Sequence, residues 1–517
     1  MNTVGQACFW RRPAWWVAAA VAVRNADGLR HVRRTLASVD RPTLVNQRLA
    51  AVNPMVLHVV VPVLREQLHI TGALAWFLPL LRDLPGSTLT FVSTAREDHE
   101  REHLAGLISG MTAADLTVRR FPQLTGDELT ALVEALAMSG EDSLSLATAA
   151  GVLAAFPTTA DVLTDELARA PHSAPVVRHV HYRGYGRKAA QVNAAVAELA
   201  TDSAEEYIAV YDVDSRPSPE LLRRTAEFLA RRCGEDGDLL RVVQQSARFA
   251  TLGAAGSWWE RSLCRGAARV QTLWTVRREI PNLRRYARSV RRPRTSPVLR
   301  GLAQTVGHGL LVRADVFREV GGLPTFTVLD DVAFGYRLTV AGIPVDSLPF
   351  TTTVPAAEYL PEVLAQDERW FQSYLDYPKC AIHWHRQGQG SPLNHAVALA
   401  TGARRGMAWL LVSPATAVCL ALALGPRTRL PVRAAATAAL WAATVAPVRL
   451  LAKAQGERLT VRETAVQSAE TLAGLLIKSI GPMTALVRWA STGTRHTVLA
   501  PKSNRRTDPL TTDRETP

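Results

Sequence analysis

Two aspartates that follow an apolar run are the residues of this sequence best suited to chemistry. Asp212 and Asp214 come directly after the run Ile208–Tyr211, and two prolines follow them. The run predicts a buried strand and the prolines predict its end. Carboxylates at i and i+2 of an extended chain share one face, and a divalent cation that joins them to a diphosphate removes their mutual repulsion.

Two other interpretations of this pair have to be weighed. A solvated Asp-x-Asp turn needs no ligand and has the same sequence signature. An EF-hand loop is excluded, because Arg216 and Pro217 stand where that loop needs a ligand and then a glycine. The choice between a metal site and a solvated turn therefore depends on the rest of the chain.

Alternating strand and helix patterns predict an α/β sheet around the pair. Leu57–Val63 and Thr88–Ser93 read as strands, and the stretch from Ile70 to Leu84 between them reads as a helix. This order implies a right-handed parallel βαβ unit. Further strands are predicted at 176–181, 239–245 and 305–312, and further helices at 188–199, 219–232, 314–320 and 332–340.

The composition is strongly basic. The chain has 517 residues and a net charge of +14, which suits an anionic membrane surface, a phosphorylated substrate or a nucleic acid. Residues 277–300 hold nine arginines and one acid, Glu279. This run predicts either a solvated basic segment or one that lies on anionic lipid or near a diphosphate. Aromatic residues are not interleaved with it, so we expect no nucleic-acid partner. The five cysteines are scattered, and we expect no disulfide framework or zinc site.

The ends of the chain differ from its middle. Residues 1–54 are basic and apolar, and their apolar run 13–23 is too short to span a bilayer, so a packed or interfacial helix is expected. Residues 379–490 predict two or three membrane helices, and residues 491–517 predict a disordered tail. The membrane helices are expected at 407–424, 434–452 and 467–487, the last interrupted by Glu470 and Lys478, and a re-entrant hairpin remains an alternative for the first two.

Further motifs follow the Asp-x-Asp pair at regular places. Asp330 and Asp331 precede the predicted helix 332–340, and Gln366, Arg369 and Trp370 share one helical face at i, i+3 and i+4. With nothing else known, the first pair would be a helix N-terminal acid pair and the second set an amphipathic helix face. The other motifs are Val59–Val63, Gly184-Tyr-Gly186-Arg-Lys188, Gly307–Arg313 and Gly321-Gly322.

Taken in this order, the motifs resemble those of membrane-associated family-2 glycosyltransferases. Similar in kind are the cellulose, hyaluronan and chitin synthases and the ceramide glucosyltransferases. The resemblance covers about residues 55–378 and implies a catalytic domain there, with a single mixed sheet of the GT-A type flanked by helices. Residues 97–172 read as a helical insertion into this domain, unlike the compact core of the family. It also implies a multi-pass protein of the cell membrane with its catalytic domain in the cytosol.

The resemblance assigns roles to individual residues. Asp212 and Asp214 would hold Mg²⁺ or Mn²⁺ against the diphosphate of a nucleotide-sugar donor, and Lys188 would lie near the nucleotide. Asp331 would be the general base for the acceptor hydroxyl, with inversion at the anomeric carbon, and Asp330 beside it would raise its pKa. For the QxxRW motif, the resemblance implies that Trp370 is an acceptor platform, that Arg369 faces the diphosphate and that Gln366 lies on the same helical face.

Some features depart from this family. Its second strand usually ends in an aspartate that reads the base, whereas here Phe91–Arg96 contains none. UDP as the nucleotide therefore rests on analogy alone, and a lipid-linked acceptor competes with a polysaccharide one. His308, between two glycines, is either a residue of the acceptor side or a packed strand histidine.

Two other function classes stay open. The stretch Gly184–Ala189 opens a helix after a strand and fits a loose dinucleotide fingerprint, as in an NAD(P)-binding Rossmann oxidoreductase. That reading leaves Asp214, Asp330 and the QxxRW motif unexplained. An inactive basic membrane-binding protein would explain only the arginine run. Binding of NAD, set against metal-dependent binding of a nucleotide-sugar, discriminates between the two enzyme classes.

Overall fold

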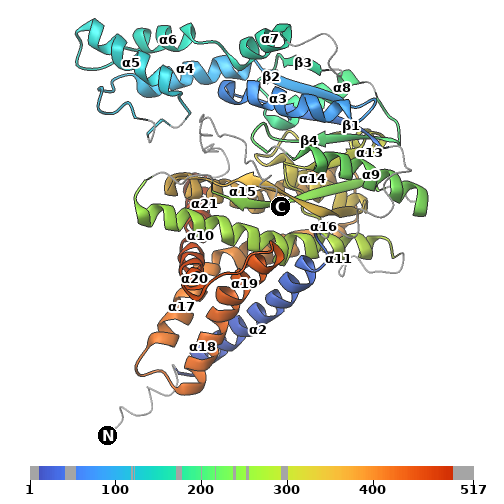
Figure 1. Cartoon of the computed structure of the whole chain (residues 1–517), viewed down its shortest axis with the longest axis vertical. Coiled ribbons are helices and arrows are strands. Elements are labelled where there is room, and N and C mark those ends of the chain that lie inside the picture. Colours follow the sequence, from blue (N-terminus) through green and yellow to red (C-terminus); the bar gives the residue numbers. More distant parts are fainter. Residues whose placement is uncertain are drawn as a thin grey trace. The chain divides into compact units, whose positions relative to one another are not determined.

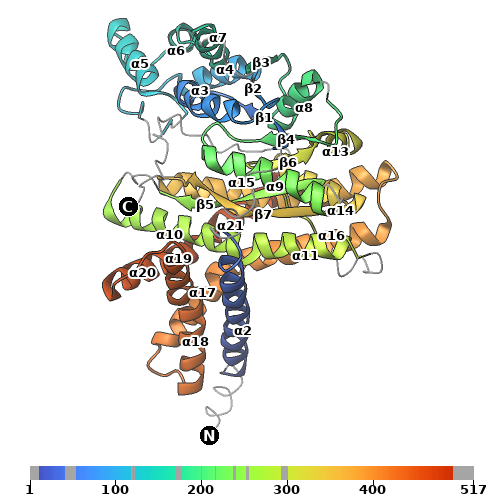
Figure 2. The ribbon, with the colours of Figure 1, turned by 45° about the vertical axis from the view of Figure 1, so that its right-hand side comes forward.

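A computed structural model describes most of the chain, and it divides into two compact units. The described residues are 11–40, 54–117, 120–121, 123–169, 177–199, 201–215, 217–236, 240–251, 256–292 and 301–492. Unit 1 comprises those within 1–48, 244–305 and 332–498, and unit 2 those within 49–243 and 306–331. The tail expected at 491–517 lies outside the described residues except at its start. Figure 1 and Figure 2 label the elements of both units.

Unit 2 is built on four parallel strands. They are β1 (Val56–Pro62), β2 (Thr88–Thr94), β3 (Val177–Tyr182) and β4 (Glu206–Val210), paired in the order β3-β2-β1-β4. Helices α3 (Gln67–Arg82), α8 (Lys188–Leu199) and α9 (Pro219–Asp236) belong to the same unit. Strands β1 and β2 are buried almost throughout, as continuous apolar runs in parallel sheets usually are.

The sheet is mixed. Strand β6 (Leu310–Arg313) pairs antiparallel with β4, and β5 (Val242–Ala250) and β7 (Val345–Pro355) complete one seven-stranded sheet in the order β3-β2-β1-β4-β6-β5-β7. The prediction of a single mixed α/β sheet is confirmed. The strand expected at 305–312 is shorter, because Gly309 has a φ of 63° and cannot continue an extended chain. Helices α13 (Ala314–Glu319) and α14 (Asp330–Ala341) follow.

The segment between β2 and β3 is helical, as predicted. It contains α4 (Arg96–Ile108), α5 (Gly126–Ser139), α6 (Leu146–Ala155) and α7 (Thr159–Arg169), drawn in cyan and blue-green in Figure 1. These helices bury an apolar cluster of their own, which includes Leu104, Leu129, Leu132 and Leu153. A self-contained core explains why the segment folds as a helical layer.

Unit 1 contains the apolar helices of the C-terminal part. They are α15 (Leu360–Arg386), α16 (Pro392–Leu410), α17 (Val412–Leu424), α18 (Leu430–Ala443), α19 (Val445–Ala454), α20 (Val461–Ile477) and α21 (Ile480–Thr492). By length and composition, the described stretches 146–169, 430–454 and 461–491 could each cross a membrane, and the pair α16 and α17 makes up to four. The span expected at 407–424 falls on this pair, which bends by 43° between α16 and α17 and so is either one broken span or a re-entrant loop.

The N-terminal helix α2 (Arg11–Leu36) packs on this part of unit 1, as a packed helix was expected to do. Ala18 is buried against Cys419, Ala436 and Ala439. The Asn25 side-chain amide donates to the carbonyl of Ala439 over 3.0 Å. Both views show α2 alongside α18.

The described part of the arginine run is structured. It continues α10 (Trp258–Trp274) as a π-helix, η3 (Thr275–Glu279), followed by α11 (Ile280–Val290). Arg277 donates to the carbonyl of Arg24 and to the side chain of Asn25, so it is packed against α2. Residues 293–300 of the run lie outside the described ranges.

The buried carboxyl of Glu279 makes the stability of the folded chain depend on pH, and this dependence tests the packing. It is buried, it accepts a hydrogen bond of 2.6 Å from the Ser246 hydroxyl, and burial raises its pKa from 4.5 to about 7. Between these two values the folded chain binds more protons than the unfolded chain, so stability decreases as the pH rises from about 4.5 through about 7. Glu279→Gln keeps an acceptor for Ser246 and carries no charge.

We expect the thermal-unfolding midpoint of Glu279→Gln to exceed that of the wild type at pH 8, and the difference to shrink at pH 5. Scanning calorimetry of the detergent-solubilised protein at both pH values measures it. An equal difference at the two pH values would contradict a buried, protonated carboxyl.

Candidate functional site

The sheet topology brings the predicted site residues of unit 2 to one edge. Strands β1, β2 and β4 are parallel, so their carboxyl ends lie together, and Asp212 follows the end of β4. Strand β6 runs the other way and begins at this edge, where the Gly309 amide donates to the Val210 carbonyl over 2.8 Å. The segment Gly307–Gly309 therefore lies beside the Asp-x-Asp turn, at the edge where ligands of open α/β sheets usually bind.

Lys188 ties the two segments together. It is the first residue of α8, and its ammonium donates to Asp212 Oδ1 and to the carbonyl of Gly307, each over 2.6 Å. The side chains of Lys188 and Asp212 are 25% and 27% exposed, so water screens the pair only in part. Its contacts are with the Asp-x-Asp turn and with the neighbouring segment at Gly307.

Gly307 lies between Lys188 and the second aspartate pair. A Cβ atom at this position would stand 3.0 Å from Lys188 Nζ and 3.2 Å from Asp331 Oδ2. Asp331 and Lys188 thus both border the space that a side chain at position 307 would fill. Two acidic motifs that lie far apart in the sequence therefore meet around one glycine.

Asp330 and Asp331 have different surroundings in the first turn of α14. The Asp331 amide donates to Asp330 Oδ1 over 3.0 Å, and Asp330 is buried whereas Asp331 is half-buried. Burial raises the pKa of Asp330, against the opposing charge of Lys188. Asp330 Oδ2 has no hydrogen-bond partner among the described residues. The outer carboxylate is the one available to a substrate, and the inner one supports the turn.

A hydrogen bond from helix α3 holds the chain just after the Asp-x-Asp pair. Trp76 of α3 donates its indole N–H to the carbonyl of Pro217 over 2.8 Å. Asp214 is half-buried and accepts a long hydrogen bond of 3.4 Å from the Ser215 hydroxyl. Burial lowers the pKa of His308, and the nearby charges of Asp212 and Asp214 oppose that shift. His308 is therefore close to both carboxylates.

The carboxylate oxygens of Asp212 and Asp214 are the candidate ligands for a metal ion. Among the described residues, no group of three or more histidine, cysteine, aspartate or glutamate side chains could hold a metal ion by itself. Asp212 and Asp214 offer carboxylate oxygens, the donors that Mg²⁺ and Mn²⁺ prefer. Mg²⁺ in particular commonly keeps several waters and binds through one or two carboxylates plus substrate phosphates. The residues present fit that mode of binding.

The predicted QxxRW residues lie in unit 1, on α15. Gln366, Arg369 and Trp370 are all half-buried. The Trp370 ring packs edge-on against Phe249, with 6.3 Å between centroids, and the Lys478 ammonium lies 5.8 Å from its centre. The site residues predicted from the sequence are therefore divided between the two units.

The glycines of the loose dinucleotide fingerprint have a packing reason. A Cβ at Gly184 would come within 2.4 Å of the Tyr182 hydroxyl, and one at Gly186 within 2.4 Å of Ala190 Cβ. Neighbouring side chains thus require both glycines without a pyrophosphate. The antiparallel strand β6 next to β4 also departs from a purely parallel dinucleotide fold.

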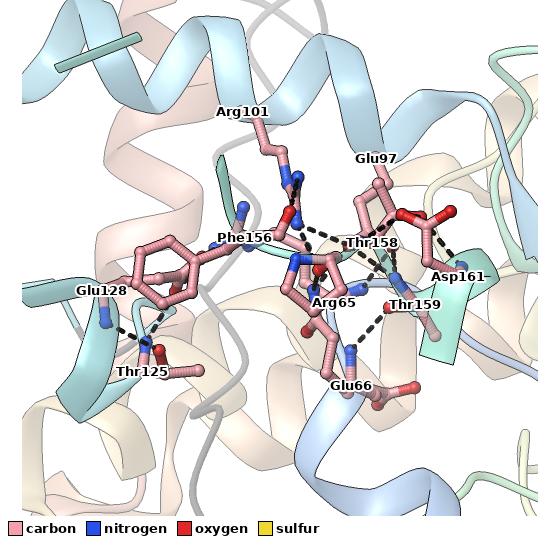
Figure 3. Close-up of polar contacts among 12 residues, drawn as sticks. Arg65, Glu66, Glu97, Arg101, Thr125, Glu128, Phe156, Thr158, Thr159 and Asp161 are labelled. Atoms are coloured by element: carbon pink, nitrogen blue, oxygen red, sulfur yellow. Dashed lines mark hydrogen bonds and ion pairs between the residues drawn. The ribbon is translucent and has the colours of Figure 1, made fainter. Parts of the chain in front are cut away.

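Sequence reasoning did not find the contacts that fix the loop after β1. Arg65 has a φ of 53° and donates to both carboxylate oxygens of Glu128, over 3.0 and 3.2 Å. Glu97 accepts from the Thr159 amide over 3.1 Å and from the Gln67 side chain over 2.7 Å. Burial raises the pKa of Glu97. Figure 3 shows this buried network, which fastens the helical insertion to the carboxyl end of β1.

This network predicts a local loss of stability in a single variant. Glu128→Gln keeps the capping box with Thr125 but leaves the Arg65 guanidinium buried without its counter-charge. Breaking a buried ion pair costs about 3–5 kcal/mol. We expect backbone hydrogen exchange in peptides from α4–α7 to accelerate by about 100-fold, as measured by mass spectrometry.

Glu166→Gln is the matched control. Glu166 pairs with Arg169, whose side chain is 69% exposed, and surface pairs contribute at most about 1 kcal/mol. Equal exchange rates in the two variants would mean that the Arg65 pair contributes no more than a surface contact.

Part of the chain matches the model of a known family. Residues 285–447 match the family model described as glycosyl transferase family group 2. The chain carries a family-2 glycosyltransferase domain. This match supports the predictions of this family and of an enzyme. The matched segment includes Asp330, Asp331 and the QxxRW residues, whereas Asp212 and Asp214 lie before it.

No curated protein matches this glycosyltransferase in sequence. Among solved structures, it is similar to the mannosyltransferase PcManGT from Pyrobaculum calidifontis, whose structure is a complex with GDP-Man and Mn²⁺. The identity is 15%, the match covers 92% of this chain and 99% of that chain, and the TM-score is 0.44.

A substitution at Gly307 tests whether the glycosyltransferase needs Lys188 and Asp331 in these positions. Gly307→Ala adds one carbon at 3.0 Å from Lys188 Nζ and 3.2 Å from Asp331 Oδ2, so one of them must move. We expect the transfer rate to fall by about 10-fold or more, since small misplacements of reacting groups are costly. Gly151→Ala, at an open helical position, is the control. Full activity of Gly307→Ala would remove Gly307 from the site.

Proposed function

We propose that this glycosyltransferase moves a sugar from a nucleotide-diphosphate donor to a lipid-linked or polysaccharide acceptor at a membrane, with metal assistance and inversion. One observation carries the proposal. The Lys188 ammonium contacts Asp212 and the Gly307 carbonyl, and Asp331 also lies beside Gly307. The residues that would bind the diphosphate and the residue that would act as the base therefore lie close together. A single displacement reaction requires both groups at the same reacting centre.

The diphosphate side consists of Asp212, Asp214 and Lys188. The two carboxylates would hold Mg²⁺ or Mn²⁺, and the bound cation would neutralise the charge that develops on the leaving diphosphate. Lys188 pairs with Asp212, and this contact directs its positive charge at the edge of the sheet. Its ammonium would then bind a phosphate oxygen of the donor.

The base side consists of Asp331 with Asp330 behind it. Asp331 would accept the proton of the acceptor hydroxyl as its oxygen attacks the anomeric carbon. Attack from the face opposite the diphosphate inverts the configuration at that carbon. Asp330 accepts the Asp331 amide hydrogen bond and so holds the turn that presents Asp331.

The acceptor side includes the QxxRW residues of α15. Trp370 would stack against the acceptor, Arg369 would bind the diphosphate with its planar guanidinium, and Gln366 shares their helical face. The half-buried state of all three side chains supports a role in binding, because each keeps some accessible surface.

The membrane location is supported by the apolar helices of unit 1. The described stretches 430–454 and 461–491 and the bent pair α16 and α17 are long and apolar enough to cross a bilayer. We propose a multi-pass protein of the cell membrane with the catalytic residues on the cytosolic side, where nucleotide-sugars are made. The donor nucleotide is UDP by analogy with the synthases; the similar mannosyltransferase structure holds GDP-Man, so both nucleotides belong in the test.

The decisive experiment measures nucleoside diphosphate release by membranes that contain the protein. A panel of UDP- and GDP-sugars is supplied with Mn²⁺ or Mg²⁺. We expect release with one donor, loss of release in EDTA and its return on adding metal. Asp331→Asn should lower the rate by about 100-fold or more while donor binding persists, because general-base catalysis contributes on this scale.

Three controls sharpen this assay. Asp212→Asn should weaken the response to metal, whereas Asp331→Asn should leave it intact. Titration with NAD should give no binding, which separates the proposal from an oxidoreductase. Release that is independent of metal, or undiminished in Asp331→Asn, would overturn the proposed roles.

A further inference from the structure

Glu470 and Lys478 lie in the interior of the apolar stretch 461–491, and the structure gives them different surroundings. Glu470 of α20 accepts from Arg265 and Arg269 of α10, over 2.7 and 2.6 Å, and helps to join those helices. Lys478 lies at the break between α20 and α21 and is 7% exposed. Charged residues inside stretches that could cross a membrane usually have a functional reason.

The Lys478 ammonium points to α15 and to two indole rings. It donates to Asp367 Oδ1 over 2.6 Å and to Gln271 Oε1 over 3.1 Å. It lies 5.1 Å from the ring centre of Trp409 and 5.8 Å from that of Trp370. Asp367 is 3% exposed, so this is a buried ion pair with two aromatic neighbours.

The backbone that carries Lys478 is fixed by a second helix break. The Trp409 indole N–H donates to the carbonyl of Lys478 over 3.0 Å, and the Ser479 hydroxyl donates to the carbonyl of Trp409 over 2.8 Å. The Ser413 amide donates to the Ser479 hydroxyl over 2.9 Å, and the Ser479 amide to the Ser413 hydroxyl over 2.8 Å. These hydrogen bonds therefore join the break between α16 and α17 to the break between α20 and α21.

Helix α21 is also in direct backbone contact with α15. A Cβ at Gly481 would come within 2.6 Å of the Leu364 carbonyl oxygen and the Glu368 nitrogen. Glu368 forms an ion pair with Arg488 on the same two helices. The position of α15, which presents Gln366, Arg369 and Trp370, is thus tied to the helix break at Lys478.

We propose that Lys478 is a positioning residue, which acts through Trp370 to set the acceptor-binding surface. The ammonium is held by Asp367 and Gln271 and attracts the faces of both indoles, so it fixes Trp370 on the side away from solvent. A cation–π contact is strongest when it is removed from water, so this one favours a single orientation of the ring. This inference rests on the proposed function, in which Trp370 supports the acceptor.

A merely structural ion pair is the competing explanation, and a double variant separates the two. Replacing a buried ion pair by apolar residues of similar size often leaves stability unchanged or higher. Lys478→Met combined with Asp367→Leu should therefore fold with a normal thermal midpoint. The cation beside Trp370 is nevertheless lost in that variant.

The test follows the fate of a radiolabelled sugar in membranes with their endogenous acceptor. The donor is the nucleotide-sugar that gives release in the assay above. For Lys478→Met with Asp367→Leu, we expect label in the lipid or polysaccharide fraction to fall by about 10-fold, and hydrolysis of the donor to free sugar to stay at the wild-type rate. A structural role would leave the ratio of transfer to hydrolysis unchanged.

The matched control removes the neighbouring ion pair of the same two helices. Arg488→Met combined with Glu368→Leu should keep the wild-type ratio, because it leaves the Lys478 ammonium beside Trp370. A fall in the ratio that is equal in both double variants would overturn the proposal, since any loosening of α21 on α15 would then suffice.

A second readout does not depend on enzymatic activity. In protein labelled with 5-fluorotryptophan, the ¹⁹F resonance of Trp370 is assigned by its absence in Trp370→Phe. We expect it to shift or broaden in Lys478→Met with Asp367→Leu and to remain in place in the control. If the wild-type protein turns over no donor, the proposed function fails while this measurement still decides on the contact. An unmoved resonance would overturn the inference.

Discussion

Collecting carboxylates at one sheet edge requires a compensating cation, and the rest of unit 2 serves to place it. Asp212, Asp214, Asp330 and Asp331 gather near Gly307, and like charges this close disfavour their ionised forms. The Lys188 ammonium relieves part of that repulsion through two contacts of 2.6 Å. The start of α8, the reversed direction of β6 and the missing side chain at position 307 all keep that ammonium between the two acidic motifs.

Local sequence patterns predict much of this architecture. The β-branched run before Asp212 and the acid pair before 332–340 were sufficient to place both motifs at element ends, because strand and helix boundaries depend on nearby residues. The two acidic motifs meet near Gly307 only because particular strands pair with each other. No local sequence pattern determines which strands pair. The Thr125–Glu128 capping box is visible in the sequence, whereas its partner Arg65 is not, since their contact joins residues far apart in the chain.

The bend between α16 and α17 shows the limit of hydropathy. Residues 407–424 carry no charge, so composition alone predicts a continuous helix. Pro414 in the first turn of α17 has no N–H for the Leu410 carbonyl, and Ser413 and Ser479 exchange backbone-to-hydroxyl hydrogen bonds across two helices. Small polar residues inside apolar stretches satisfy backbone groups that a break leaves free, and their partners cannot be read from one segment alone.

The helical segment between β2 and β3 is a connection as well as an addition. Parallel neighbours cannot be joined by a tight turn, because the chain must return to the opposite edge of the sheet before the second strand begins. Strands β2 and β3 are such neighbours, and α7 packs against both. The four helices are therefore an enlarged crossover rather than an appended domain. A shortened chain that is to keep its fold must retain a helix that makes this return, whereas the outer helices are free to vary in length among related sequences.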